Sequence, residues 1–340
     1  MKTALWDTCK LGLMGQDGTG VGDIFMSKGT ILGVGSNCIF VNASTYIRYG
    51  GHSHGISFHV ATTSTRYREV DKVLSIIDDM HSSPITIARI SSDAHFLITT
   101  CLDSTVRVWR VHTTSRSFER SYALRLQGTL SGHEGVKVTC MDICTVFGSI
   151  VTGDAKGAIL IWNLRSLSFV WRLSTDDNAR SLTKIPVPAI SVSLNRKNGN
   201  IVTLVGSSLK IFDINGTPVA TLPTEFKFPM NNMPTFAVST NCQEWMDGIV
   251  AITGHMNGDV RMWSIDYERG LLVFRHVIPD KVHDNAIICL RCQDNQKNLL
   301  IGDSSGRISM ASTMQLDSLS VSELAVVAEE IRMLSEVGKR

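Results

Sequence analysis

The sequence predicts an all-β protein folded as a β-propeller, chiefly because a unit of about fifty residues recurs along it. The stretch VTGDAKGAILIW at 151–162 shows this unit. A glycine-bracketed turn leads into an alternating apolar strand, and the strand ends at Trp162, five residues after Gly157. The same five-residue step ends at positions 60, 109, 162, 212, 263 and 311. Alternation at a period of two between turn residues is typical of half-buried antiparallel strands. Strand units repeated at this length form propeller blades, since no blade alone buries its apolar faces.

Six repeats are visible, and the sequence leaves open whether the ring has six or seven blades. A seventh blade would combine residues 1–29 with strands near 313–320 and so close the ring between the termini. The predicted limits are 1–22 for a flexible N-terminal segment, 23–315 for the propeller and 316–340 for a C-terminal helix.

The C-terminal helix is predicted to be amphipathic. Residues 320–323 read SVSE, which fits a capping box. Apolar residues then recur at spacings of three and four. Such a helix packs its apolar stripe on the propeller or docks it in a groove of a partner, and the sequence leaves both readings open. The stripe consists of Leu324, Val327, Ile331 and Leu334.

The repeats resemble those of the WD40 type, in which a histidine before the first strand and an aspartate in the tight turn hold each blade together. One unit supplies His81, Thr99, Asp103 and Trp109 for this pattern. The predicted position of the turn aspartate is occupied by Lys156 in the next unit and by Asn257 in the unit that ends at Trp263. Most blades are therefore expected to rely on apolar packing. The residues predicted to have structural roles in the blades are His81, Thr99, Asp103, Trp109, His133, Trp162, Phe212 and Trp263.

Two long stretches give a more specific resemblance. VGDIFMSKGTILGVGSNCIFV at 21–41 and HEGVKVTCMDICTVFGSIVTGDAKGAILIWNLRSLSFVWRL at 133–173 are similar to the C-terminal WD40 region of BEACH-domain proteins. That group includes neurobeachin and the lysosomal-trafficking regulators. The resemblance covers roughly residues 21–311, and Tyr49 stands where the family usually has a tryptophan. The BEACH domain and the PH-like domain before it have no counterpart here, which leaves open whether the chain is part of a longer protein.

The resemblance implies a non-enzymatic scaffold in vesicle and endolysosomal membrane trafficking. Its expected partners are other proteins, bound by the faces and loops of the propeller, and a BEACH or PH-like region on the same or a separate chain. Two alternatives are a WD40 adaptor in another pathway, such as ubiquitin ligation or RNA processing, and a propeller hydrolase. The hydrolase would need converging carboxylates or histidines around the central channel, and the sequence shows no such cluster.

The composition is that of an ordinary globular protein. Thirty-three Lys and Arg residues against 31 Asp and Glu leave a net charge of +2, which is too balanced to indicate a nucleic-acid partner. No run of 18 apolar residues predicts a membrane span, and the N-terminus does not have the pattern of a signal peptide. The eight cysteines lie mostly in apolar runs and are expected to be buried thiols. These observations predict a cytoplasmic protein, peripheral to endomembranes.

Several motifs resemble catalytic, metal-binding or phosphate-binding sites, but each is better explained as a turn, strand or linker of the repeat. GDSSG at 302–306 occupies the turn position of the repeat, and no histidine base is in place for a serine protease. His52 and His54 have no third metal ligand nearby, and Cys289 and Cys292 lie in an apolar strand that places them on opposite faces. The glycine-rich stretch at 15–20 has neither the ending nor the context of a phosphate loop. The sequence therefore predicts no catalytic residue, no cofactor and no metal.

One residue is a candidate for partner contact. Trp245 lies in the polar stretch NCQEWMDG, where an exposed tryptophan would serve as an anchor for a bound protein. Packing over the edge of a blade is the alternative reading of the same residue.

Overall fold

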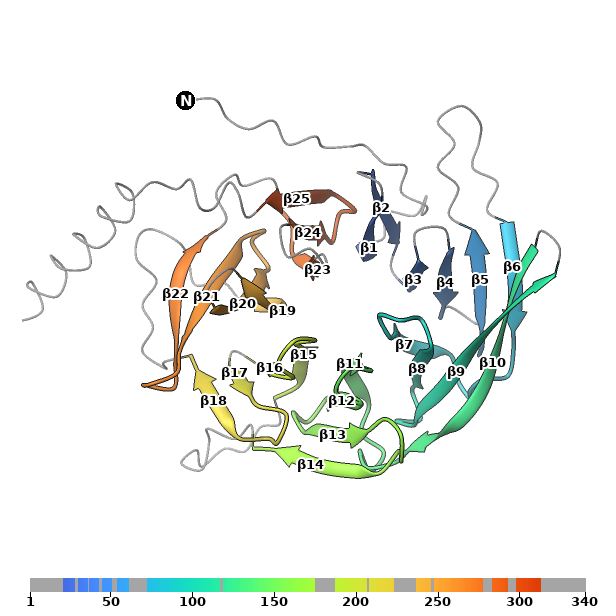
Figure 1. Ribbon diagram of the computed structural model, residues 1–340, viewed down its shortest axis with the longest axis horizontal. Helices are drawn as coiled ribbons and strands as arrows, with labels where there is room; N and C mark the ends of the chain where they lie inside the picture. The colour runs from blue at the N-terminus through green and yellow to red at the C-terminus, as the bar shows by residue number, and fades with distance from the viewer. Residues whose placement is uncertain are drawn as a thin grey trace, which may run out of the picture.

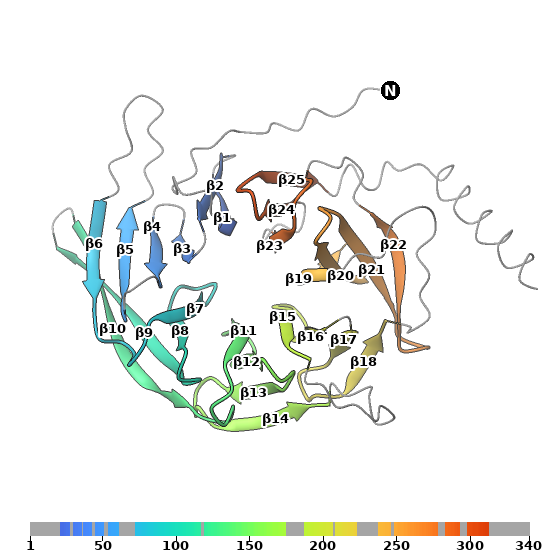
Figure 2. The same cartoon turned by 180° about the vertical axis from the view of Figure 1, so that it is seen from behind.

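In the computed structural model the chain forms a ring of β-sheets (Figure 1; Figure 2 shows it from behind). No helix occurs in the described residues. The structure describes residues 21–27, 30–35, 37–42, 45–50, 54–60, 72–116, 119–174, 187–206, 208–222, 237–245, 248–277, 283–292 and 298–312. The expected helix at 316–340 lies outside these residues, as do the strands expected near 313–320, so both stay predictions.

Five four-stranded antiparallel blades make up most of the ring. The first contains β3 (Cys38–Asn42), β4 (Thr45–Tyr49), β5 (Ile56–Val60) and β6 (Lys72–Ile77). The second contains β7 (Ile85–Ile90), β8 (Phe96–Cys101), β9 (Val106–Arg116) and β10 (Glu119–Leu130). The third contains β11 (Val138–Cys144), β12 (Ser149–Asp154), β13 (Ile159–Asn163) and β14 (Phe169–Leu173).

The fourth and fifth blades are hydrogen-bonded to each other at their outer strands, where Thr221 pairs with Leu271. The fourth contains β15 (Ala189–Leu194), β16 (Ile201–Val205), β17 (Ser208–Phe212) and β18 (Pro218–Thr221). The fifth contains β19 (Ala237–Trp245), β20 (Gly248–His255), β21 (Val260–Asp266) and β22 (Leu271–Val277). The sixth sheet has three described strands, which are β23 (Ile287–Cys292), β24 (Asn298–Asp303) and β25 (Ile308–Ser312).

The remaining gap in the ring holds a two-stranded sheet. It pairs β1 (Val21–Ser27) with β2 (Thr30–Gly35) and lies between β23–β25 and β3–β6 (Figure 1). The described residues thus form five four-stranded blades, one three-stranded sheet and one two-stranded sheet. Strand β1 falls within residues 1–29, but the strands expected to join it near 313–320 lie outside the described residues, so the composition of the seventh blade stays a prediction. All six predicted repeat ends, from position 60 to position 311, lie on the third strand of their blade.

The hydrophobic core lies between the blades. On the second strand of a blade, adjacent residues face opposite neighbours: Leu97 packs with the β3–β6 blade, and Ile98 packs with the β11–β14 blade. On β16, Ile201 packs with the β11–β14 blade and Val202 packs with the β19–β22 blade. Because successive side chains of a strand point to opposite faces, a strand buried on both sides reads as a continuous apolar run.

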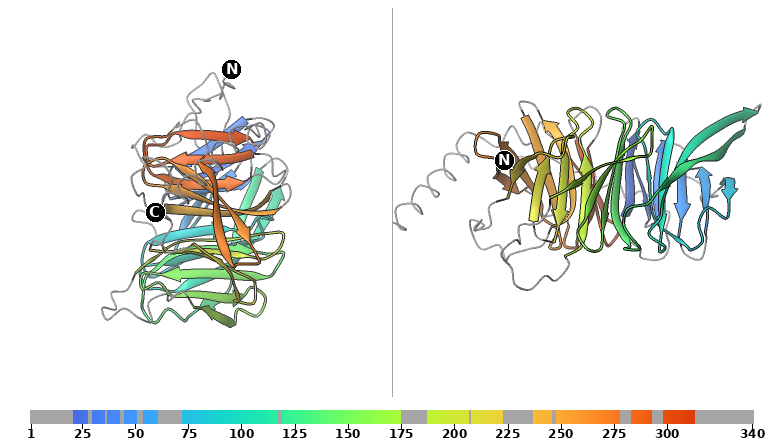
Figure 3. Two further views of the ribbon diagram at one scale, coloured as in Figure 1. Left: turned by 90° about the vertical axis from the view of Figure 1, so that its left-hand side faces the viewer. Right: turned by 90° about the horizontal axis from the view of Figure 1, so that it is seen from below.

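The hairpin of β9 and β10 is longer than its neighbours and projects past them (Figure 3). It is anchored on the preceding blade. The rings of Tyr122 and Phe58 stack with their centroids 4.5 Å apart, and the Tyr122 N–H donates to Ser75 Oγ at 3.0 Å.

Asp23 on β1 connects three units of the ring. Its carboxylate accepts the Phe40 N–H of β3 at 2.9 Å and the Arg291 guanidinium of β23 at 3.0 Å. It also accepts the N–H of Ile24, whose side chain is fully buried. This one side chain therefore holds the closing sheet to both of its neighbours.

Replacement of Asp23 by alanine is expected to lower the free energy of unfolding by about 2–4 kcal/mol, because it removes the acceptor of the Phe40 N–H and the carboxylate that pairs with Arg291. Urea unfolding measures the change. Asp213→Ala is the matched control, since among the described residues its carboxylate accepts N–H groups of its own turn and does not connect two blades. A loss for Asp23→Ala no larger than for this control would contradict a ring-closing role.

Candidate functional site

The β11–β14 blade has a buried network of four polar side chains. His133 Nδ1 lies 2.9 Å from Asp154 Oδ2, and His133 Nε2 lies 2.7 Å from Thr152 Oγ1. The indole N–H of Trp162 donates to the same hydroxyl at 2.9 Å. The network ties the loop before the first strand to the second and third strands. All four residues are buried.

The prediction that Lys156 occupies the position of the structural aspartate is wrong. Asp154 forms the bond to His133, and its Oδ1 atom accepts the N–H groups of Lys156 and Ala158 at 2.9 and 3.0 Å. The aspartate lies at the end of β12, eight residues before the tryptophan. Counting back from the hairpin turn placed it two residues too late. Lys156 itself is exposed.

Gly157 is required by this turn for two reasons. Its φ of 84° lies in the left-handed region, which favours glycine. A Cβ atom there would also lie 2.4 Å from the Val187 carbonyl oxygen of the next blade. The glycine therefore allows both the hairpin and the close approach of two blades.

The β23–β25 sheet contains a network that sequence reasoning missed. His283 Nδ1 lies 2.9 Å from Asp303 Oδ2, and His283 Nε2 lies 2.6 Å from Ser309 Oγ. The second strand has Ile301 where β12 has Thr152, and Ser309, which pairs with Ile301, supplies the hydroxyl from the third strand. The available signal was the spacing: Asp303 precedes the strand end at 311 by eight residues, as Asp154 precedes Trp162.

The other blades replace this aspartate. In β19–β22, His255 occupies its position, and Asn257, the predicted residue, comes two positions later. His255 Nε2 lies 2.9 Å from Thr253 Oγ1, which also accepts the Trp263 indole N–H at 2.9 Å. In β15–β18 the corresponding residue is Val205. Phe212 is 1% exposed and closes this blade by apolar packing.

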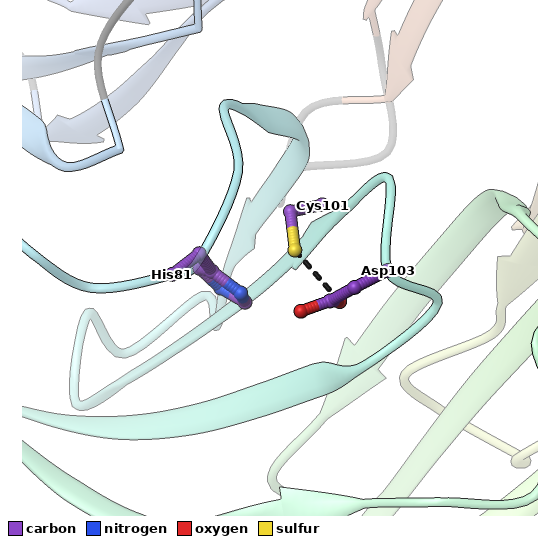
Figure 4. Close-up of side chains that lie close together, drawn as sticks. All are labelled: His81, Cys101 and Asp103. Carbon is purple, nitrogen blue, oxygen red and sulfur yellow. Dashed lines mark hydrogen bonds between the residues drawn. The ribbon is translucent and has the colours of Figure 1, made fainter.

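The β7–β10 blade has a cysteine at the position of the aspartate. His81 Nε2 lies 2.8 Å from Thr99 Oγ1, which accepts the Trp109 indole N–H at 2.8 Å. Asp103 does not contact His81 by a hydrogen bond. It accepts hydrogen bonds from Cys101 Sγ, Ser82 and Thr105 at 2.7–2.9 Å and so fixes the turn. Figure 4 shows His81, Cys101 and Asp103 together.

These environments shift several pKa values. Burial favours the neutral form of Asp154, but the His133 hydrogen bond and the two N–H groups outweigh it, so its pKa is lowered. The pKa of Asp303 is lowered for similar reasons, with Ser305 and His283 as the main donors against burial. Burial and the nearby Arg107 lower the pKa of His81 to about 4, so its ring is neutral near pH 7. Burial raises the pKa of the Cys140 thiol to about 12.

A cavity of about 180 Å³ lies among the first strands of the blades. Three arginines and two aspartates line it: Arg89, Arg196, Arg291, Asp23 and Asp142. Asp142 carries a second inter-blade bond, because it accepts the Leu194 N–H at 2.7 Å. The cavity is thus lined partly by charges that hold the blades together.

Exposed apolar side chains gather on β14, the outer strand of its blade. Phe169, Val170 and Trp171 are 54%, 37% and 50% exposed. Trp245, the contact residue predicted from the sequence, ends β19 and pairs with Gly248, and its side chain lies outside the described residues. Cys289 is a free thiol on β23, His54 lies just before β5, and His52 lies outside the described residues.

The ring of blades and its histidine–hydroxyl–tryptophan networks define a WD40-type β-propeller. Residues 72–110 and 124–163 match the family model of the WD domain, G-beta repeat. The first match runs from β6 of one blade to β9 of the next, so a sequence repeat spans two blades. The predicted all-β propeller and its WD40 type are confirmed.

Curated relatives make the likeness more specific. The chain is 29% identical to Protein SPIRRIG of Arabidopsis thaliana over 82% of its length, and 27% identical to BEACH domain-containing protein A2 of the same plant over 85%. It is 29% identical to Beige protein homolog 1 of Schizosaccharomyces pombe over 58%. It spans only 8%, 8% and 7% of those relatives. The chain is a WD40-repeat protein related to BEACH-domain proteins, which confirms the predicted resemblance. Among the described residues, no helix has the length and apolarity to cross a membrane.

The Asp154 assignment can be tested by a pair of substitutions. Asp154→Ala is expected to cost about 2–4 kcal/mol of stability, because it leaves the buried His133 Nδ1 and two N–H groups unsatisfied. Lys156→Asp, at an exposed position, is expected to change stability by less than about 0.5 kcal/mol. Thermal and urea unfolding of both variants decide the point. A clear gain in stability for Lys156→Asp would restore position 156 as the structural one.

The lowered pKa of Asp303 makes stability depend on pH. Because the folded-state pKa lies below the unfolded value, the carboxylate stabilises the fold above the ordinary value of 3.8. This contribution is lost as pH falls through the folded-state pKa. Asp303→Asn is expected to be less stable at pH 7 and to lose less on acidification than the wild type. Melting temperatures between pH 7 and pH 3 measure both effects, and parallel curves for the two proteins would refute the assignment.

Proposed function

We propose that this chain is a non-enzymatic scaffold for protein interactions, the propeller of a BEACH-type protein that acts in vesicle and endolysosomal membrane trafficking. The observation that carries the proposal is the similarity to BEACH domain-containing protein A2 and to SPIRRIG across most of the chain. The WD40 fold supports a binding role, since it places loops and strand edges on a rigid ring.

The geometry favours binding of proteins at the rim of the ring. The networks around His133, His255 and His283 are buried within their blades, so they are not available to a partner protein. Phe169 and Trp171 on β14 are half exposed, and large aromatic side chains of this kind are typical anchors of protein interfaces. The proposed partners are other proteins, including a BEACH or PH-like region on the same or a separate chain. The proposed location is the cytoplasm, at the periphery of endomembranes.

Proximity labelling with the full chain in eukaryotic cells tests the proposal. The matched variant carries Phe169→Ser and Trp171→Ser, which are expected to leave the propeller folded because both side chains are about half exposed. We expect the wild type to enrich BEACH-domain proteins and endolysosomal membrane proteins, and the variant to enrich them less.

Two other outcomes of the labelling experiment would change the proposal. Enrichment dominated by ubiquitin-ligase subunits or RNA-processing proteins would replace the trafficking role by that of an adaptor in another pathway. Equal enrichment by the wild type and the folded double variant would remove β14 from the binding surface without affecting the trafficking role.

A further inference from the structure

The β7–β10 blade differs from its neighbours at one chemically important position. Cys101 stands two residues after the hydroxyl residue Thr99, where the β11–β14 blade has Asp154 after Thr152. In this blade neither Cys101 nor the turn aspartate Asp103 forms a hydrogen bond with the histidine. His81 is only 4% exposed, and its Nδ1 atom is buried without a hydrogen-bond partner. A buried polar atom of this kind normally has a hydrogen-bond partner, so an unpartnered one needs an explanation, and a bound ion is one.

Three potential metal ligands lie close together at this point of the blade. One ligand atom each from His81, Cys101 and Asp103 lies within 4.8 Å of the other two (Figure 4). The histidine precedes β7, the cysteine ends β8, and the aspartate lies in the turn to β9. Cys101 is fully buried, whereas Asp103 is exposed and opens the cluster to solvent.

The surroundings orient the histidine for coordination. Its Nε2 atom contacts Thr99 Oγ1 at 2.8 Å, and that hydroxyl also accepts the Trp109 indole N–H, which fixes its position. With the imidazole proton on Nε2, the Nδ1 atom presents its lone pair to the cluster. A hydrogen bond to the other ring nitrogen is the usual arrangement of a metal-bound histidine.

We propose that His81, Cys101 and Asp103 bind a divalent transition-metal ion of the zinc type. One imidazole nitrogen, one thiolate and one carboxylate form a borderline-soft donor set, which suits zinc and disfavours calcium and magnesium, whose ligands are oxygens. Three protein ligands leave the fourth tetrahedral position to water, on the exposed side of Asp103.

Binding requires a local change and releases a proton. The Cys101 thiol, which donates to Asp103 Oδ1 at 2.7 Å, loses its proton to solvent as the sulfur–metal bond forms. The sulfur and oxygen atoms then separate to about 3.5 Å, the spacing that tetrahedral zinc geometry gives them. Asp103 keeps its hydrogen bonds from Ser82 and Thr105, which position the carboxylate.

The charges in the site favour a cation once the thiol has ionised. Arg107 donates a hydrogen bond to the Met80 carbonyl beside His81, and its charge opposes a cation. The thiolate and the Asp103 carboxylate together carry two negative charges, which offset it. Since the ion replaces the thiol proton, affinity is expected to rise with pH. The ion would join the loop before β7 to the end of β8, as the Asp154 carboxylate joins the corresponding segments of the next blade.

Titration of the full-length chain with Co²⁺, used as a spectroscopic substitute for Zn²⁺, tests the proposal. We expect a one-to-one complex with a thiolate-to-cobalt charge-transfer band, and Zn²⁺ should displace the Co²⁺. The informative variant is Cys101→Asp, which offers His81 a carboxylate as in the neighbouring blade and is expected to fold. It should lack the band, and Cys140→Ala, at another buried thiol, should keep it.

A second variant keeps the test decisive if Cys101→Asp does not fold. Asp103→Asn, at an exposed position, is expected to weaken Co²⁺ binding about tenfold or more while the band of the bound form persists. No one-to-one complex with the wild type would overturn the proposal. An undiminished band in folded Cys101→Asp, or unchanged affinity in Asp103→Asn, would also overturn it.

Discussion

The whole structure depends on burial of apolar surface between blades, because no blade has a core of its own. The clusters that contain Leu97 and Ile98 belong to different pairs of blades, although the two residues are adjacent on β8. Each blade is therefore stable only with both neighbours present, and the ring must close. Closure depends on the two-stranded sheet of β1 and β2. Within it, the Asp23 carboxylate accepts hydrogen bonds from the sheets on both sides. The inter-blade carboxylate of Asp142 repeats this solution where β11 meets β15.

This packing explains why the polar networks vary so much from blade to blade. The position two residues after the hydroxyl residue holds Asp154, Cys101, His255 or Val205 in different blades, and the apolar contacts persist in all of them. Where the second strand has Ile301, the hydroxyl of Ser309 on the third strand takes over. The network secures the turn and the loop before the first strand, while the interfaces hold the ring. The residues of the network can therefore differ from blade to blade while the ring stays closed.

The sequence predicted the parts of the fold that depend on periodicity and missed those that depend on distance in space. The spacing of strand ends identified the third strand of six blades, because alternation and length repeat regularly. It could not place Asp154, since hairpin length varies and counting from Trp162 does not show which side chain faces His133. The sequence does not show Cys101 as a possible metal ligand, because His81, which lies beside it in the blade, precedes it by 20 positions. Sequence spacing does not reveal that a buried histidine lacks a partner.

Two groups of polar residues in this ring show how a structural network differs from a binding site. His283, Asp303 and Ser309 have the connectivity of a catalytic triad, but they are 3%, 0% and 6% exposed, so a substrate carbonyl cannot reach the serine. Each polar atom of that contact is also satisfied by its neighbour. In the cysteine blade the geometry is similar, but one nitrogen has no partner and one carboxylate faces solvent. In this fold a polar network can therefore bind a ligand where one of its atoms lacks a hydrogen-bond partner and one of its residues faces solvent. The complete, buried networks stabilise their blades instead.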